Sequence, residues 1–329
     1  MSKVTKNSLL SIFKKYHLKN KESINLVNDR IDNLPITSNP NLLINGDFQV
    51  WQRGDNFKVE SFKYGCDRWL HYYDANISKT NNGLYYRREA SINTVNPYLR
   101  QSLIMTNTML NRDFVFTVKI SNLNVTNGMY LLVKNRTTNT NLVTQYSFSV
   151  DGIHSVIGKF LGSVGDIIDC YIAVYNTTDV ISFNVEWVKL ELGSVATPFV
   201  PKTYAEELRD CQRYYQRWTQ KSDNQDIGLS SSYMATPNSA YPIIPLTTEM
   251  RVSPTIKCSN ISDLEFYCIN SANGSYEHIS LLSLSTYLFG KDRLTVYTEI
   301  NSASTVGSGC SLQLKRGIGK WFELDAEIY

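Results

Sequence analysis

The sequence predicts a mainly β protein in which two β-rich bodies follow a short helical segment. At 329 residues the chain exceeds a single hydrophobic core of ordinary size. Its 21 tyrosines and 12% aromatic residues favour strands. Short apolar segments separated by Asn, Gly and Thr turns recur over residues 41–199, with no helical pattern between them.

Residues 1–40 are expected to form a helical anchor and linker. Apolar residues recur at helical spacing over 5–34, in two pieces that are interrupted around residues 19–21. The second piece has a coiled-coil seam but spans only about eleven residues, fewer than a lone helix needs in water. We expect it to self-associate or to attach to a partner, the alternative being a helix packed against its own body. The seam residues are Ile24, Val27, Ile31 and Leu34.

Residues 41–200 are expected to form an antiparallel β-sandwich. Strands of regular spacing that are joined by turns are typical of this architecture. The clearest predicted strands are 114–120, 129–133, 145–150, 167–175 and 181–185.

Two sets of motifs in this region resemble known families. The opening segment 41–48, with Trp51 and Gly54, and the closing strand 185–192 resemble jelly-roll carbohydrate-binding modules. A longer series resembles tail-fibre-type structural proteins of phages and prophages. That series comprises 49–54, 66–69, 189–193, 196–199, 206–208, 211–215 and the terminal 321–328.

The segment 201–218 is expected to be a connecting helix. Thr203 and Glu206 have the spacing of a capping box, so the helix should start at about Tyr204. Four apolar residues then repeat at helical spacing, and they either meet in a trimer or cover the flank of one sandwich. These residues are Leu208, Cys211, Tyr215 and Trp218.

Residues 219–329 are expected to form a second, sandwich-like β domain that acts as a tip. Proline flanks its first strands, 240–246 and 250–256, as in edge strands, and 293–300 alternates cleanly. The last strand, 321–328, should have one apolar face and one polar face.

Composition and motifs argue against several functional classes. A net charge of +3 is too small for a typical nucleic-acid-binding protein. The six cysteines lie far apart, which indicates buried free thiols and a reducing cytoplasm. No apolar run is long enough for a membrane span, and no metal-binding histidine motif or nucleophile elbow occurs, so no catalytic residue is predicted.

Sugar binding is easier to motivate, because sugars stack their apolar C–H faces on aromatic rings. Strand alternation must turn about half of such rings inward, so each has a structural alternative. The candidate ligand-binding residues are Trp69, Tyr72, Tyr73, Tyr85, Tyr86 and Arg87.

The resemblances imply a non-enzymatic virion fibre on the tail or head that binds a host-surface glycan. They further imply a homotrimer, attachment to other virion proteins through the N-terminal helices, and assembly in the host cytoplasm. Jelly-roll modules often hold a structural calcium ion, for which Asp47 is the candidate ligand. The alternative is a carbohydrate-binding module of a glycan-degrading enzyme or depolymerase.

Overall fold

The computed structural model describes residues 15–23, 38–92, 94–175, 177–269, 274–301 and 304–329. It contains two compact units, residues 1–39 and residues 40–329. In the first unit, residues 15–23 are helical without the predicted interruption at 19–21, because Lys and Glu are good helix formers that tolerate one asparagine. Ile24, Val27, Ile31 and Leu34 lie outside the described residues, so their self-association and the anchor role stay predictions.

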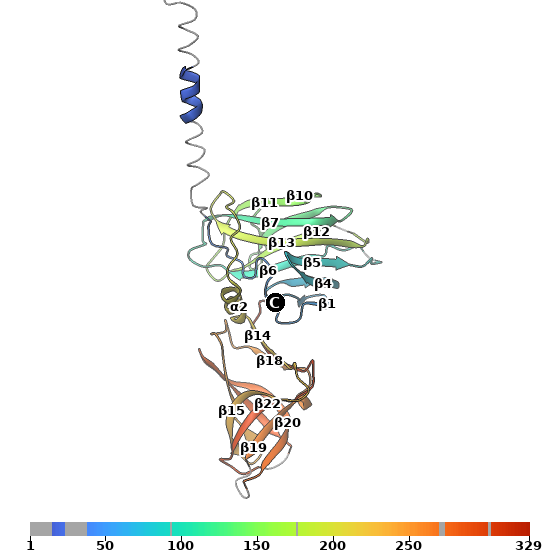
Figure 1. Cartoon of the computed structure of the whole chain (residues 1–329), viewed down its shortest axis with the longest axis vertical. Helices are drawn as coiled ribbons and strands as arrows, with labels where there is room; N and C mark the ends of the chain where they lie inside the picture. Colours follow the sequence, from blue (N-terminus) through green and yellow to red (C-terminus); the bar gives the residue numbers. More distant parts are fainter. Residues whose placement is uncertain (1–14, 24–37, 93, 176, 270–273, 302–303) are drawn as a thin grey trace, which may run out of the picture. The chain divides into compact units, whose positions relative to one another are not determined.

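A β-sandwich occupies the first part of the second unit (Figure 1). One sheet has six strands in the order β1-β4-β5-β13-β7-β11, and the other has the order β10-β8-β12-β6-β3-β2 with β9 beside β8. The first sheet comprises β1 (Asn56–Val59), β4 (Ala75–Thr80), β5 (Gly83–Arg88), β13 (Ile181–Leu192), β7 (Asp113–Asn124) and β11 (Gly152–Lys159). The second comprises β10 (Tyr146–Phe148), β8 (Met129–Asn135), β12 (Ile167–Val174), β6 (Tyr98–Ile104), β3 (Leu70–Tyr72), β2 (Lys63–Tyr64) and β9 (Thr140–Asn141).

Strand alternation builds the core of this sandwich. On β7 the buried Phe114, Phe116 and Val118 face the core, and on β12 the residues Cys170 and Ile172 do the same. Side chains at the intervening positions are directed to the outer surfaces of the two sheets. The mainly β prediction is therefore confirmed, and the strands expected at 114–120, 129–133, 167–175 and 181–185 lie within or largely overlap β7, β8, β12 and β13.

The connecting helix is shorter than predicted. Helix α2 spans Tyr204–Gln212, and the expected capping box of Thr203 and Glu206 is present. The chain then enters strand β14 (Tyr215–Thr219), which pairs with β23 (Trp321–Asp325). The prediction that Tyr215 and Trp218 continue one helical stripe is wrong, since pairing with β23 satisfies the backbone of this segment and outweighs the helical spacing of its apolar residues.

The C-terminal region is not a second sandwich. Six of its strands close into a ring, because β15 pairs with both β17 and β22 at opposite ends of the order β15-β17-β21-β20-β19-β22. These strands are β15 (Ile227–Thr236), β17 (Ile243–Pro245), β21 (Arg293–Ile300), β20 (Tyr276–Phe289), β19 (Leu264–Ile269) and β22 (Gly309–Leu314), with β16 (Ser239–Ala240) on β15 and β21. Closure removes the exposed edges that an open sheet would leave. Beside this closed sheet, β14, β23 and β18 (Thr255–Cys258) form a sheet of three strands, and η1 (Ile261–Asp263) precedes β19.

The last strand is buried on both faces rather than one. Phe322 and Leu324 pack in the core of the closed sheet, as the alternation predicts. The opposite face carries Glu323, Asp325 and Glu327, which are only 6–8% exposed. The expected polar face therefore meets other protein groups and not water, because the end of the chain returns to the sandwich.

All six cysteines are free thiols, and all but Cys258 are buried. In the described part of the chain, no helix is long and apolar enough to cross a membrane.

His71 on β3 is a buried polar side chain of the sandwich whose hydrogen-bonding capacity is unsatisfied. Its ring is fully buried and lies parallel to that of Tyr86, with 6.0 Å between the ring centroids. Among the described residues, neither ring nitrogen has a hydrogen-bond partner. Burial lowers the pKa of His71 to about 3.

We expect acid to destabilise the protein through His71. An unfolded histidine binds a proton at about pH 6.5, whereas the buried ring stays neutral down to about pH 3. The unfolded state therefore binds more protons between these values, and the free energy of unfolding falls as the pH falls. Between pH 7 and pH 5 the free energy of unfolding, measured in urea, should fall by roughly 2 kcal/mol less in His71→Phe than in the wild type. His17→Phe, at an exposed position, is the control, and parallel pH profiles for wild type and His71→Phe would contradict the expectation.

Candidate functional site

The structure separates the aromatic residues that the sequence grouped into one cluster. Trp69 and Tyr86 are fully buried core residues, and the indole N–H of Trp69 donates to the Asn45 carbonyl at 3.0 Å. Tyr85 and Arg87 lie on β5, on the outer surface of the six-stranded sheet. Tyr72 and its neighbour Tyr73 instead belong to the end of β3, in the other sheet, and both are partly exposed.

Further tyrosines, which the sequence analysis missed, surround Tyr72 on the outer surface of the second sheet. The register places Tyr72, Tyr98, Ala173 and Tyr130 side by side across β3, β6, β12 and β8. All the tyrosines concerned are partly exposed. We call this surface the tyrosine face and define it as Tyr72, Tyr98, Tyr130, Tyr171 and Tyr175.

The rings of the tyrosine face contact one another in two groups. Tyr98 stacks on Tyr72 with 4.7 Å between centroids and meets the edge of Tyr171 at 5.0 Å. Tyr130 and Tyr175 form the second group, at 4.7 Å. Such contacts hold the rings in place, and each of the five rings belongs to a partly exposed residue.

A buried carboxylate organises the polar groups beside these rings. Asp169 is fully buried and accepts hydrogen bonds from Ser102 at 2.6 Å and from the Tyr171 hydroxyl at 2.9 Å. Arg100 and Arg136 form ion pairs with it at 3.5 and 3.4 Å. Burial and the adjacent Asp169 raise the pKa of Tyr171, which therefore stays a neutral hydrogen-bonding group. The face thus combines ring surfaces with fixed donors.

The sequence held a usable signal for this face. In 167–175 the core residues Ile168, Cys170, Ile172 and Val174 occupy the even positions. Strand alternation therefore assigns Tyr171 to the outer face. Which strands lie beside β12 depends on pairing across the sheet, and no local pattern in one sequence specifies that pairing.

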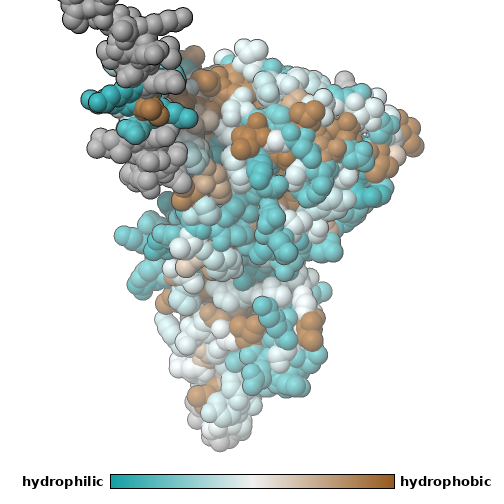
Figure 2. All heavy atoms as spheres, turned by 45° about the horizontal axis from the view of Figure 1, so that its top comes forward, coloured by the Kyte–Doolittle hydropathy of each residue, from teal (hydrophilic) through white to brown (hydrophobic). Residues whose placement is uncertain are grey.

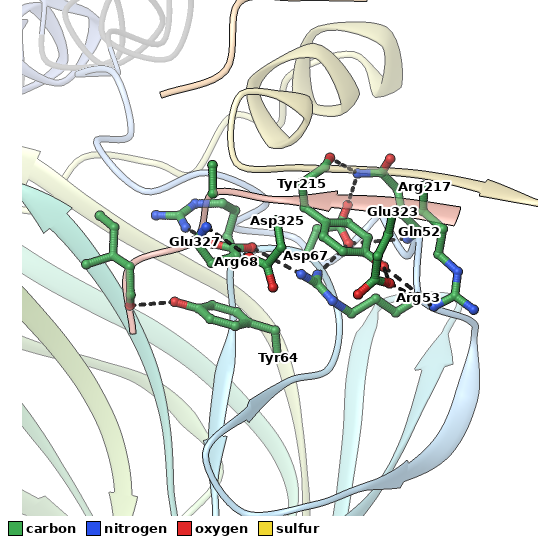
Figure 3. Close-up of polar contacts among 12 residues, drawn as sticks. Gln52, Arg53, Tyr64, Asp67, Arg68, Tyr215, Arg217, Glu323, Asp325 and Glu327 are labelled. Atoms are coloured by element: carbon green, nitrogen blue, oxygen red, sulfur yellow. Dashed lines mark hydrogen bonds and ion pairs between the residues drawn. The ribbon is translucent and has the colours of Figure 1, made fainter. Parts of the chain in front are cut away.

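A second group of polar side chains joins the sandwich to the end of the chain (Figure 3). Arg68 forms an ion pair with Glu327, and both side chains are at most 1% exposed. Arg53 approaches Asp67 to 3.2 Å, and its guanidinium carbon lies 3.4 Å from the ring centroid of Tyr215. Burial raises the pKa of Asp67 to about 6, while Arg53 acts in the opposite direction. We call this group the ionic joint.

Two further carboxylates of the ionic joint lie on β23, and both are engaged. Glu323 accepts a hydrogen bond from the Tyr215 hydroxyl at 2.5 Å. Asp325 accepts one from Lys257 at 2.9 Å and one from the Tyr329 hydroxyl at 2.5 Å. Burial acts to raise the pKa of Asp325, but these hydrogen bonds hold it below its usual value.

A cavity of about 540 Å³ opens beside the ionic joint, with Phe57, Lys63 and Trp321 in its wall. The acids in its wall that come from β23 are bound to cations or hydroxyls of the same chain. These contacts favour a structural role for the joint over acid–base chemistry.

Of the residues expected to mediate trimer contacts, the four in 201–218 face their own chain. Cys211 and Tyr215 are at most 1% exposed. Trp218 packs on Phe322 with 5.7 Å between ring centroids. Leu208 is partly buried on α2. This arrangement matches the alternative in which the apolar residues cover the flank of one body.

Asp47, the candidate calcium ligand, accepts a hydrogen bond from Gln49 at 2.9 Å, and its buried Oδ1 has no partner. Calcium takes six to eight oxygen ligands, and one free carboxylate oxygen supplies few of them. Over the described ranges, no three His, Cys, Asp or Glu side chains converge as a metal site. The calcium ion stays a prediction.

Comparison with known proteins adds little to this geometry. No family model and no curated protein matches the chain. A similar solved structure is the N-terminal CBM22-1-CBM22-2 tandem domain of Xyn10C from Paenibacillus barcinonensis, with a TM-score of 0.30, 9% identity and coverage of 88% of this chain and 97% of that one. Another is a cycloisomaltooligosaccharide glucanotransferase of Paenibacillus sp. complexed with cycloisomaltoheptaose, with a TM-score of 0.22, 10% identity and coverage of 80% and 46%. At such TM-scores the function has to be argued from the residues of this chain.

Loss of one partner in the ionic joint should destabilise the protein strongly. Arg68→Met leaves the buried Glu327 carboxylate without its main cation, which typically costs about 3–5 kcal/mol. Urea unfolding measures the change. The double variant Arg68→Met with Glu327→Met removes both charges and should recover most of the loss.

Arg293→Met is the matched control, because its ion pair with Asp292 is exposed and should contribute little. Equal stability of the Arg68 and Arg293 variants would show that the joint does not hold the sandwich to the last strand.

Proposed function

We propose that this protein binds glycans through the tyrosine face. The observation that supports this is the alignment of partly exposed rings beside fixed polar groups on one sheet surface. Sugar rings stack their C–H faces on such rings, and neighbouring charged or hydroxyl groups take their hydroxyls. Arg136, whose side chain is 27% exposed, and the oxygen of the Tyr171 hydroxyl would take this role.

The outer surface of the six-stranded sheet makes a poorer candidate. Tyr85 stands there opposite Asn184 and Ser78, with no stacked ring beside it in the register. A single ring offers one stacking position, whereas the tyrosine face offers several along neighbouring strands. Several weak contacts on one rigid surface add up at a low entropic cost.

Removing one central ring should weaken glycan binding. Tyr98→Ala deletes the ring that contacts both Tyr72 and Tyr171, and we expect about tenfold or greater loss of affinity for the best ligand of a glycan array. Affinity electrophoresis or calorimetry provides the measurement. Tyr233→Ala, an exposed tyrosine on β15, is the matched control and should bind normally. If Tyr85→Ala abolishes binding and Tyr98→Ala does not, the ligand occupies the other sheet.

We propose two settings for this glycan-binding surface. In the first, the protein is a virion fibre that binds a host-surface glycan without cleaving it. Its support is the order of motifs that resembles tail-fibre-type proteins, from 49–54 through 211–215 to 321–328. In this setting the N-terminal residues attach to other virion proteins, and three copies raise avidity by making later contacts intramolecular. The other setting, a binding module of a glycan-degrading enzyme, is supported equally by the tyrosine face.

The two settings differ in oligomeric state and in chemistry. Light scattering on the full chain should report a trimer for the fibre and a monomer for an appended module. Deleting residues 1–39, the first compact unit, should convert the trimer to a monomer if that unit holds the copies together. A fall in the viscosity of a bound polysaccharide would show cleavage and would contradict the fibre.

A further inference from the structure

Arg88 is a buried cation that has no acidic partner among the described residues. It ends strand β5 and is 4% exposed. Its Nη1 has no hydrogen-bond partner, and within the described residues no carboxylate forms an ion pair with it. The nearest aromatic contact is the ring of Tyr73, whose centroid lies 6.0 Å from the guanidinium carbon.

Arg88 lines a cavity of about 300 Å³, and the two carboxylates in the wall of this cavity are already engaged. Asp74 pairs with Lys58 at 3.1 Å and also accepts the Ser61 backbone N–H. Glu89 pairs with Arg87 at 2.9 Å. Within each pair the two opposite charges neutralise each other. The positive charge of Arg88 in the cavity wall is then not neutralised.

A buried charge is costly unless a counter-charge or good hydrogen bonds accompany it. The guanidinium fork matches a carboxylate especially well, because two parallel N–H groups can meet its two oxygens. An anion that enters the cavity from outside would supply the counter-charge that the chain does not provide.

One residue of the cavity wall contacts the tyrosine face. Tyr73 lies in the cavity wall, and its ring contacts that of Tyr72 with 4.2 Å between centroids. Tyr72 in turn stacks on Tyr98. The chain crosses here from β3 in one sheet to β4 in the other, so the cavity lies at the edge of the sandwich where the row of rings ends.

We infer that the protein selects glycans that carry a carboxylate, with the sugar rings on the tyrosine face and the carboxylate against Arg88. This inference rests on the proposed glycan binding and specifies its substrate class. The ring contacts would serve neutral and acidic sugars alike. Arg88 would supply the discrimination between them.

The test compares acidic polysaccharides and their methyl esters, which differ only in the charge of the carboxyl group. Binding of polygalacturonate, alginate and hyaluronan is measured by affinity electrophoresis beside that of the esterified forms. We expect at least one acid form to bind about 10- to 100-fold more tightly than its ester. Arg88→Met should remove that difference, Arg88→Lys should keep part of it, and Arg209→Met, at an exposed position on α2, should leave it unchanged.

The outcomes separate this inference from the proposed function. Binding of neutral glycans that depends on Tyr98, with no preference for acid over ester in any pair, would overturn the role of Arg88 and leave glycan binding intact. Binding of dextran sulfate alone would overturn selection of a carboxylate. Failure to bind any glycan would overturn both. Thermal unfolding of Arg88→Met checks that the fold survives, which we expect because the side chain has no ionic partner to lose.

Discussion

The arrangement of residues 40–329 depends on the burial of charged groups in the ionic joint. Arg53 and Arg68 belong to the sandwich, whereas Glu327 belongs to the last residues of the chain. Because an unpaired buried charge is far more costly than a paired one, neither side can leave without exposing or orphaning its partners. Tyr214 and Tyr215, on which the two arginines stack at 3.5 and 3.4 Å, tie β14 to the same group. Figure 2 shows hydrophilic side chains over the middle of the molecular surface.

The need to hold buried polar groups in place also explains several of the motifs that carry the family resemblances. Asn45 adopts φ 56° and holds the backbone of Val50 and Asp67 with its side chain. Its own N–H donates to the buried Glu207 of α2 at 2.7 Å. A Cβ on Gly46 would lie 2.5 Å from the Val188 carbonyl oxygen, so only glycine fits there. These residues fix the connecting helix to the sandwich. The motifs therefore specify how the sandwich is joined to the segment that follows it.

How much the sequence could predict follows from the range of the interactions involved. The capping box at Thr203 and the strand at 293–300 were predicted correctly, because both depend on neighbouring residues. The helical reading of Tyr215 and Trp218 was wrong, because pairing with β23, more than 100 residues away, determines their conformation. The closed sheet and the tyrosine face escaped prediction for the same reason, since both arise from the order of strands. Trp69 and Tyr86 were proposed as ligand contacts, yet both are buried in the core of the sandwich.

Burial separates structural from functional polar groups in this chain. In the ionic joint nearly every buried cation forms an ion pair with a carboxylate of the same chain, so these charges are neutralised without a ligand. Beneath the tyrosine face, Asp169 is likewise shared between Arg100 and Arg136. Arg88 is also buried but lacks such a partner among the described residues, and it lines a cavity with Tyr73, whose ring contacts Tyr72. Since folding alone gains nothing from an unpaired buried cation, a counter-charge that arrives with a ligand would account for the position of Arg88.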